Sequence, residues 1–324
     1  MTASRTPPRV WVMHDGKIGM ANQVIGLAEA LGWPFEEKRL VIRAPWRHLT
    51  PRLWLCPLRA LDPSGAVLTP PWPDLVIACG RNTVAPARAV KRRSAGKTFW
   101  VQVQDPRFAR GEVDLVVAPR HDRAVGANNF PTLGAVHRVT PEKIADGVQR
   151  LGSRFAALPH PLVAVLIGGD NAVYRLSDAG FARLCDQLAA LARQGFGLAI
   201  TPSRRTGAAK SALLHEKLKG LPAMIWDGNG ENPYFAMLGM ADAILVTADS
   251  VSMVSEAAAT GKPVYVIALE GGSAKFTRFH EAMREAGITR PFAGAIERWR
   301  YAAPDDTARA AAEIRRRMAE AGAR

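Results

Sequence analysis

The chain has 324 residues, of which 48% are hydrophobic and 22% are charged, a balance typical of globular proteins that excludes a disordered chain. This length exceeds that of one ordinary hydrophobic core and predicts two domains. The formal net charge of +14 favours acidic partners such as phosphorylated metabolites or anionic lipid. The basic residues are dispersed, without the interleaved aromatic residues of nucleic-acid-binding motifs, so no nucleic-acid partner is expected.

The N-terminal segment lacks the apolar core of a signal peptide, and no apolar run approaches the length of a membrane span. Cys56, Cys79 and Cys185 stand singly, with neither zinc-ligand nor redox-motif spacing. We therefore expect a cytoplasmic protein in which the cysteines are buried thiols.

In the first half, short runs of β-branched and apolar residues alternate with helical spacing. This alternation predicts a parallel sheet with right-handed crossovers. The expected strands are 10–13, 36–41, 75–78, 98–103 and 114–117, and the expected helices are 22–31 and 84–94.

A further helix is expected from Thr140-Pro141-Glu142, where a cap residue precedes a proline at the first helical position. It is expected to end near residue 157, because prolines follow at 159 and 161. The sequence therefore predicts a domain boundary between residues 158 and 159.

The second half repeats the same alternation. The expected strands are 162–167, 197–201, 223–226, 243–247 and 264–268, and the expected helices are 177–194, 207–219, 233–240, 251–260 and 275–286. A last helix begins near Asp305, where acidic residues suit a helix N-terminus. The prediction is α/β: two Rossmann-like doubly wound domains, 1–158 and 159–324, that face a cleft, with the last helix in the second domain.

The first candidate site follows the first strand as His14-Asp15-Gly16-Lys17. His14 and Asp15 lie at the carboxyl end of a strand, and the side chain of each can accept a proton from a substrate. Asp105, at the end of a later strand, is a third candidate base. The glycine spacing matches neither the dinucleotide-binding motif nor the P-loop. An ordinary strand-to-helix turn remains the alternative.

Two loops of the second half are candidates for binding a diphosphate. The Gly168-Gly169 turn, followed by Asp170, is expected to leave backbone N–H groups free for phosphate. The run Ser203-Arg204-Arg205-Thr206 offers guanidinium groups that can bind phosphate bidentately. The alternatives are a plain loop and a solvated basic loop.

The fourth candidate is a helix that follows the strand 243–247. Asp249 and Ser250 precede it, Ser252 and Met253 lie in its first turn, and Glu256 lies further along. The Glu256 carboxylate is placed to accept hydrogen bonds from ribose hydroxyls of a nucleotide whose phosphates lie at the helix start. A surface glutamate is the alternative. No D-x-D metal triplet occurs in a strand-to-helix loop, so we expect no obligatory divalent metal. No other cofactor is expected.

The segment 46–59 combines tryptophans, leucines and arginines, a mixture found at lipid headgroup boundaries. It predicts reversible docking on the anionic inner leaflet of a membrane. The alternative is that Leu49, Leu53 and Leu55 belong to the core while the arginines face water. Pro51 and Pro57 also oppose one long amphipathic helix.

The sequence resembles the plant elongated-mitochondria (ELM) fission family and its bacterial branch of candidate glycosyltransferases over nearly its whole length. The resemblance rests on Asp15-Gly16-Lys17-x-Gly19-x-x-x-Gln23, Ser203-Arg204-Arg205-Thr206, Asn232-Pro233-Tyr234, Asp249-Ser250-x-Ser252-Met253-x-x-Glu256 and Gly261-Lys262-Pro263-Val264. It implies a GT-B fold with the acceptor site in the first domain and the nucleotide-sugar site in the second. The helix of Glu256 is similar to the ribose-binding helix of GT-B enzymes related to the peptidoglycan N-acetylglucosamine transferase. Met20 departs from the pattern, because relatives often have a histidine there.

The function that this resemblance implies is metal-independent transfer of a sugar from a nucleoside diphosphate to an acceptor hydroxyl. Asp15 is the first choice of base, followed by His14 and Asp105. The acceptor is not identified by the sequence, and a lipid-linked acceptor in envelope glycoconjugate synthesis is one option. A non-catalytic GT-B-like adaptor in membrane remodelling and a nucleotide-sugar epimerase are the alternatives.

Overall fold

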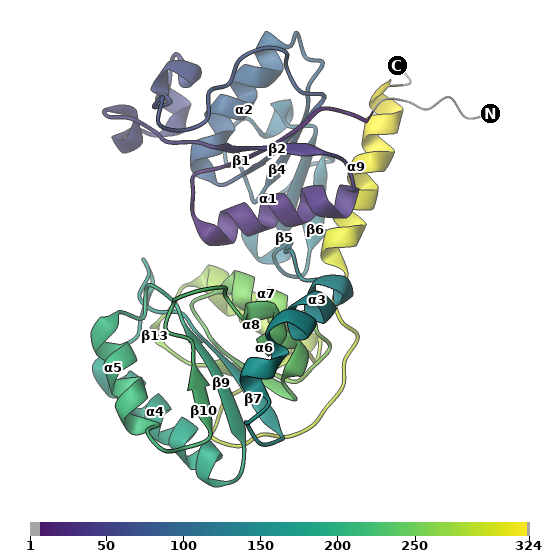
Figure 1. The fold of residues 1–324 in the computed structure, drawn as a ribbon. Coiled ribbons are helices and arrows are strands. Elements are labelled where there is room, and N and C mark those ends of the chain that lie inside the picture. The colour runs from purple at the N-terminus through teal and green to yellow at the C-terminus, as the bar shows by residue number, and fades with distance from the viewer. Residues whose placement is uncertain (1–6, 323–324) are drawn as a thin grey trace, which may run out of the picture. The chain divides into compact units, whose positions relative to one another are not determined.

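The computed structural model describes residues 7–322, which form two compact units. Unit 1 contains the described residues up to Arg138 and those from Asp305 onward, and unit 2 contains Val139–Pro304. Each unit has a parallel six-stranded sheet with helices packed against it (Figure 1). The predicted α/β class with two doubly wound sheets is confirmed.

The sheet of unit 1 has the strand order β2-β1-β3-β4-β5-β6, and every neighbouring pair is parallel. Strands β1, β3 and β5 are buried along their whole length, as expected when helices cover both faces. The elements of unit 1 are β1 (Val10–His14), α1 (Ile18–Leu31), β2 (Phe35–Arg39), β3 (Leu75–Cys79), α2 (Arg81–Arg93), β4 (Phe99–Val103), β5 (Leu115–Pro119), β6 (Asn129–Thr132) and α9 (Asp306–Gly322).

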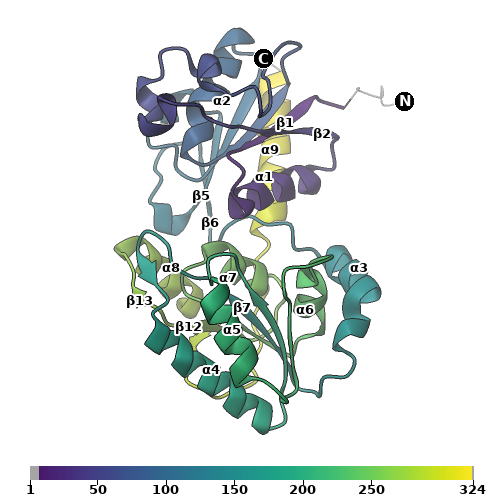
Figure 2. The same cartoon turned by 60° about the vertical axis from the view of Figure 1, so that its left-hand side comes forward.

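Helix α9, the last in the described chain, packs beside α1 in unit 1 (Figure 2). The buried carboxylate of Asp306 accepts hydrogen bonds from the backbone N–H groups of Leu133 and Gly134, at 2.8 and 3.1 Å. Further along the helix, Arg315 donates to the carbonyl of Leu31 at 2.8 Å. These contacts place in unit 1 a helix that the sequence prediction had assigned to the second domain.

The sheet of unit 2 has the order β10-β9-β7-β11-β12-β14, which is 3-2-1-4-5-6 when its strands are renumbered along the unit. This is the order of dinucleotide-binding sheets. A separate antiparallel pair joins β8 (Tyr174–Arg175) to β13 (Glu270–Gly271). The remaining elements are α3 (Pro141–Leu151), β7 (Leu162–Ile167), α4 (Asp178–Arg193), β9 (Gly197–Pro202), α5 (Ala208–Lys217), β10 (Ala223–Ile225), α6 (Tyr234–Met240), β11 (Ala243–Thr247), α7 (Val251–Ala258), β12 (Val264–Ile267), α8 (Ala274–Glu285) and β14 (Thr289–Pro291).

Helix α3 belongs to unit 2, because it packs closely on α6. A Cβ atom on Gly147 would lie 2.7 Å from the Cβ of Phe235, and one on Gly239 would lie 2.4 Å from a methyl of Val148. Only glycines permit the two helices to approach this closely. The chain therefore divides between residues 138 and 139, before α3, whereas the sequence placed the boundary after it.

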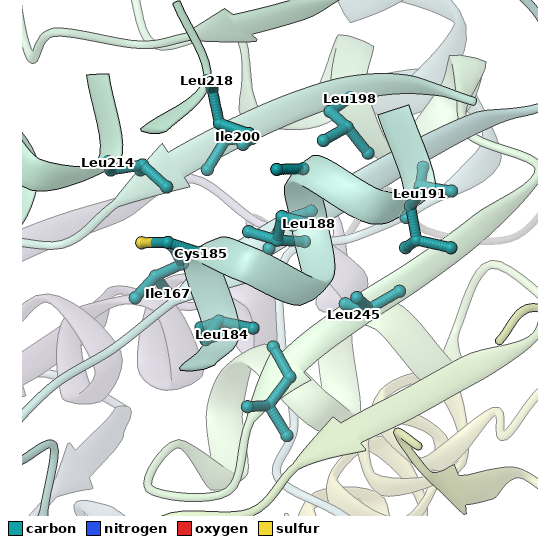
Figure 3. Packing of buried hydrophobic residues seen from close by; sticks show 14 of the residues in the cluster. Ile167, Leu184, Cys185, Leu188, Leu191, Leu198, Ile200, Leu214, Leu218 and Leu245 are labelled. Atoms are coloured by element: carbon teal, nitrogen blue, oxygen red, sulfur yellow. The ribbon is translucent and has the colours of Figure 1, made fainter. Parts of the chain in front are cut away.

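One hydrophobic cluster of unit 2 lies between the sheet and α4 (Figure 3). Leu184, Cys185 and Leu188 of α4 pack there, and burial raises the pKa of the Cys185 thiol to about 11. Cys79 is also buried, but Cys56 is exposed, so the expectation of three buried thiols is wrong for Cys56. Within residues 7–322, no helix is both long and apolar enough to span a membrane.

Candidate functional site

The candidate site of unit 2 lies where the strand order reverses. Strands β7 and β11 are neighbours, yet the chain continues from β7 to β9 on one side and from β11 to β12 on the other. Open α/β sheets bind ligands at such a point, outside the carboxyl ends of the strands. Here those ends carry Gly168-Gly169 and Asp249-Ser250, two of the sequence-predicted motifs.

A buried carboxylate occupies this point. Oδ2 of Asp249 lies 2.7 Å from an Nη atom of Arg205 and accepts the backbone N–H of Gly169 at 3.2 Å. Oδ1 of Asp249 is buried and has no hydrogen-bond partner among the described residues. The N–H of Gly168 donates to Thr247 Oγ1 at 2.7 Å. Both glycine N–H groups are therefore occupied, and the expectation that this turn leaves them free for phosphate is wrong.

The two glycines are required by the close approach of their neighbours. A Cβ atom at position 168 would lie 2.3 Å from both carboxylate oxygens of Asp249, and one at position 169 would lie 2.3 Å from the backbone oxygen of Arg205. Real Cβ atoms do not come so close to other heavy atoms, so a side chain at either position would displace the loop.

We expect Gly169→Ala to lower the free energy of unfolding by about 2 kcal/mol, because a backbone carbonyl must move to admit the methyl group. The melting temperature should fall by about 4–8 °C. Gly111→Ala is the matched control, since a Cβ there meets open space and its φ lies outside the left-handed region. Equal melting temperatures for the two variants would contradict the packing described here.

The predicted Ser203–Thr206 loop closes over the same turn. Ser203 Oγ and Thr206 Oγ1 both donate to the carbonyl of Gly168, at 3.0 and 2.6 Å. Both arginines are exposed, Arg205 with 41% of its side chain. Arg205 nevertheless donates to the carbonyl of Gly169 at 3.1 Å and pairs with Asp249. The two adjacent arginines thus differ: Arg205 fastens the loop to the sheet edge, and Arg204 is accessible to a ligand.

Hydrogen bonds also hold the loop that follows the glycine turn. Asp170 is exposed, and its Oδ1 accepts the backbone N–H of Leu176 at 2.7 Å. Asn171 Nδ2 donates to the carbonyl of Asp249 at 3.3 Å. Asp170 therefore shapes the loop, and Asn171, which the sequence did not single out, connects it to the end of β11.

Helix α7 begins at the same edge. Ser250 caps it by accepting the backbone N–H of Met253 at 3.3 Å, as the sequence predicted. The amides of Val251 and Ser252 have no carbonyl in a preceding turn to bond with, so they carry the partial positive charge of the helix N-terminus. This end of α7 can therefore bind an anion.

His280 of α8 forms a hydrogen bond at this edge of the sheet, and it was not predicted from the sequence. Its Nε2 lies 2.9 Å from the carbonyl oxygen of Ala248 and must donate, because a carbonyl only accepts. Burial lowers the pKa of His280, which keeps the ring neutral at pH 7. Nδ1 is then a buried acceptor, without a partner among residues 7–322. No sequence motif surrounds His280, so only the fold could identify it.

Glu256 of α7 is buried, with 5% of its surface exposed, which excludes the surface-glutamate alternative. Tyr234 Oη donates to Glu256 Oε2 at 2.5 Å. Burial and the nearby Glu256 charge raise the pKa of Tyr234, so its hydroxyl stays protonated and keeps donating. Tyr234 is the first residue of α6, and its backbone N–H donates to Asn232 Oδ1 at 3.1 Å. The Asn232-Pro233-Tyr234 motif thus orients the carboxylate of Glu256.

The candidate site of unit 1 lies at the carboxyl ends of β1 and β3. Asp15 Oδ2 accepts hydrogen bonds from Lys17 Nζ at 2.7 Å and from Asn82 Nδ2 at 3.2 Å. The other oxygen, Oδ1, is buried and has no hydrogen-bond partner in the described part of the chain. Asp15 therefore has one oxygen oriented by two hydrogen bonds and a second oxygen with spare acceptor capacity.

In each of the other two candidate bases, both polar atoms of the side chain are bonded. His14 Nδ1 accepts the N–H of Gly16 at 3.1 Å, and its Nε2 donates to Glu37 at 2.8 Å. Asp105 Oδ1 accepts from Arg110 Nε at 2.8 Å, and Arg110 also bonds Oδ2. Burial raises the pKa of Asp105, but the hydrogen bonds of Arg110 and the Arg107 backbone outweigh it, and the net pKa lies below the usual value. Of the three candidates, Asp15 is the best placed to accept a proton.

The loop that carries Asp105 is strained. Gln104, Arg107 and Ala109 have φ angles of 69°, 60° and 60°, in the left-handed region that non-glycine residues rarely adopt. Gln104 is held by a 3.3 Å hydrogen bond from its Nε2 to Gln23 of α1. Such strain persists where the surrounding structure imposes it, often at functional sites.

In the part of the chain that the structure describes, no group of three or more His, Cys, Asp or Glu residues is placed to hold a metal ion.

Comparison with known proteins shows the family and the fold. A family model described as Mitochondrial fission ELM1 matches residues 18–318. The mitochondrial fission protein ELM1 of Arabidopsis thaliana is 35% identical over 277 residues, which cover 77% of this chain and 65% of that protein. The chain thus spans slightly less than two thirds of that relative.

Two solved structures show the fold class. MurG of Acinetobacter baumannii has a TM-score of 0.52 and 14% identity, over 97% of this chain and 93% of that chain. The UDP-GlcNAc 2-epimerase of Neisseria meningitidis, bound to UDP-GlcNAc, has a TM-score of 0.53 and 12% identity, over 95% and 91%. The chain has a GT-B-like fold with two Rossmann-like sheets, as the sequence resemblance implied.

Proposed function

Because this chain belongs to the mitochondrial fission ELM1 family and combines a GT-B-like fold with two polar sheet edges, we propose that it is a metal-independent glycosyltransferase. In this proposal unit 2 binds a nucleoside-diphosphate sugar, and unit 1 supplies the base that deprotonates an acceptor hydroxyl. The observation that carries it is the start of α7 at the strand-order reversal of unit 2, with the oriented carboxylate of Glu256 further along the helix.

The donor site would use different residues for the phosphates and the ribose. Arg204 and the N-terminal amides of α7 bind the diphosphate, and Glu256 accepts hydrogen bonds from the ribose hydroxyls. Ser252 and Met253 line the first helical turn beside the phosphates. Arg205 and Asp249 act indirectly, because their ion pair holds the glycine turn and the Ser203–Thr206 loop in place.

In the transfer step, Asp15 accepts the proton of the acceptor hydroxyl while the hydroxyl oxygen bonds to the anomeric carbon. The bond from that carbon to the diphosphate oxygen breaks, and the diphosphate leaves with the electron pair. Arg204 and the N-terminus of α7 stabilise the negative charge that develops on the leaving group. No metal ion is required in this scheme.

UDP-GlcNAc is the first donor to test, because an epimerase of similar fold was solved with it. Thermal unfolding should show stabilisation of about 2.7 kcal/mol once the ligand reaches a hundredfold excess over its Kd. Incubation with acceptor candidates should then release UDP. If neither this nor other nucleotide sugars raise the melting temperature at millimolar concentration, the proposal is wrong.

An epimerase is a second candidate, favoured by the similarity to UDP-GlcNAc 2-epimerases. It would use the same donor site without an acceptor. Incubating UDP-GlcNAc alone and separating the sugars distinguishes the two reactions, because only an epimerase forms the 2-epimer under these conditions. A non-catalytic adaptor, the alternative suggested by the name of the family, has no need of the oriented Glu256 carboxylate.

We expect Glu256→Gln to weaken nucleotide binding roughly 10- to 100-fold, because a charged acceptor of the ribose hydroxyls becomes neutral. The amide oxygen can still accept from Tyr234, so the melting temperature without ligand should change little. Glu256→Ala is a poorer probe, since it leaves the buried Tyr234 hydroxyl without that acceptor. The check is calorimetric titration with UDP and with its 2′,3′-dideoxy analogue. A loss equal for both ligands would place Glu256 away from the ribose.

A further inference from the structure

The segment that follows β2 is folded and anchored, although it contains only short 3₁₀ turns, at Trp46–His48, Pro51–Leu53 and Pro57–Ala60. Trp54 and Ala60 are buried together against Ala85 of α2. The segment therefore has a fixed inner side, held against the helix that follows β3.

The leucines of this segment lie on its outer side. Leu49 is 41% exposed, Leu53 is 61% exposed and Leu55 is 96% exposed. The expectation that these leucines might instead belong to the core is wrong, because Trp54 takes the buried position among them. Three large apolar side chains thus gather within seven consecutive residues, 49–55, whereas exposed hydrophobic residues scattered singly are normal on a protein surface.

Positive charge surrounds these leucines. Arg47, Arg52 and Arg59 are exposed, and the chain contains no aspartate or glutamate from residue 43 to residue 61. Arg43 lies over the ring of Trp46, with its guanidinium carbon 5.1 Å from the ring centroid, and Trp46 is partly exposed. Aromatic and arginine side chains in contact are typical of the boundary between lipid tails and headgroups.

We propose that Leu49, Leu53 and Leu55, together with Arg47, Arg52 and Arg59, form a docking surface for an anionic lipid bilayer. The leucines enter the boundary between headgroups and acyl chains, and the arginines bind the lipid phosphates. An anionic bilayer matches both the apolar and the basic character of the surface. The inference does not depend on the proposed transferase activity, because it uses none of the residues of the two candidate sites.

The test is co-sedimentation of the full chain with sucrose-loaded vesicles. Vesicles of phosphatidylcholine with phosphatidylglycerol should bind the protein, and vesicles of phosphatidylcholine alone should bind it much more weakly. Raising sodium chloride from about 0.1 M to about 0.5 M shortens the screening length from about 10 Å to about 4 Å and should release it. In the double variant Arg47→Gln with Arg52→Gln, each substitution should weaken vesicle binding about fivefold.

The double variant Leu53→Ser with Leu55→Ser should weaken vesicle binding about tenfold or more. Both side chains are exposed, so its melting temperature should match that of the unchanged protein. The control is Val125→Ser with Arg120→Gln. This pair is also exposed in unit 1, but it follows β5, which is four strands away from β2 in the sheet. The control should bind vesicles as the unchanged protein does.

Several results would overturn the proposal. Absence of binding to anionic vesicles at low salt is one, and binding that survives the leucine and arginine changes is another. A dimer in solution that dissociates in the Leu53→Ser, Leu55→Ser variant would show that a second copy of the chain covers this surface instead.

Discussion

Arg205→Ala should lower the free energy of unfolding by about 2 kcal/mol, because it removes the cation beside the buried carboxylate of Asp249. The side chain of Asp249 is 0% exposed, whereas that of Arg205 is 41% exposed, so water that enters in place of the guanidinium offsets part of the loss. The variant also loses the hydrogen bond to the Gly169 carbonyl. Urea denaturation of the purified protein measures the change.

Two further variants identify the cause of that loss. Arg204→Ala should leave the free energy of unfolding within about 0.5 kcal/mol, because Arg204 is exposed and takes no part in the ion pair of Arg205 with Asp249. It should instead weaken binding of a nucleoside diphosphate more than binding of the nucleoside, which lacks phosphate. Arg205→Ala combined with Asp249→Asn should recover most of the lost stability, since the buried charge is removed. Equal stability of Arg204→Ala and Arg205→Ala would contradict the assignment of separate roles.

Asp15→Asn should reduce the rate of sugar transfer roughly 10²- to 10⁴-fold, because an amide cannot accept the proton of the acceptor hydroxyl. The donor Kd should stay nearly unchanged, since Asp15 lies in unit 1 and the proposed donor residues lie in unit 2. Single-turnover measurement of UDP release, with acceptor present, separates this chemical effect from binding.

Asp105→Asn is the matched control for Asp15→Asn. Both oxygens of Asp105 are bonded by Arg110, and its lowered pKa makes it a weaker base than an ordinary aspartate. Its substitution should therefore have little effect on the chemical step. A variant series in which Asp105→Asn abolishes transfer and Asp15→Asn retains it would reverse the assignment of the base.

The elements with continuous apolar runs could be predicted from the sequence, because a strand buried on both faces leaves a clear signal. Runs such as Leu162–Ile167 gave the strand directly. The edge strands β6 and β14 were not predicted, because they are short and each contains a proline. Proline has no N–H group to donate to a neighbouring strand, so in sheets it occurs mainly in edge strands. The place of α9 depends on the contacts of Asp306 with Leu133 and Gly134, far away in sequence, and no local pattern encodes them.

The sequence located both sheet edges but could not assign how each polar group is used. Gly168-Gly169 was recognised as a special turn, yet its N–H groups are bonded to Asp249 and Thr247, which come from a different strand-to-helix connection. Arg204 and Arg205 are indistinguishable as residue types, and only the fold gives them different partners. Tyr234 and His280 act through contacts with α7 and the end of β11, so their roles appear only in three dimensions.

We propose above all that unit 2 binds a nucleoside diphosphate at the carboxyl ends of β7 and β11. The most direct test is a crystal structure of the protein soaked with UDP above its measured Kd. We expect the diphosphate in contact with Arg204 and the N-terminal amides of α7, and the ribose hydroxyls within hydrogen-bond distance of Glu256. Nucleotide density at another place, or none at a concentration that saturates the protein in solution, would contradict the account.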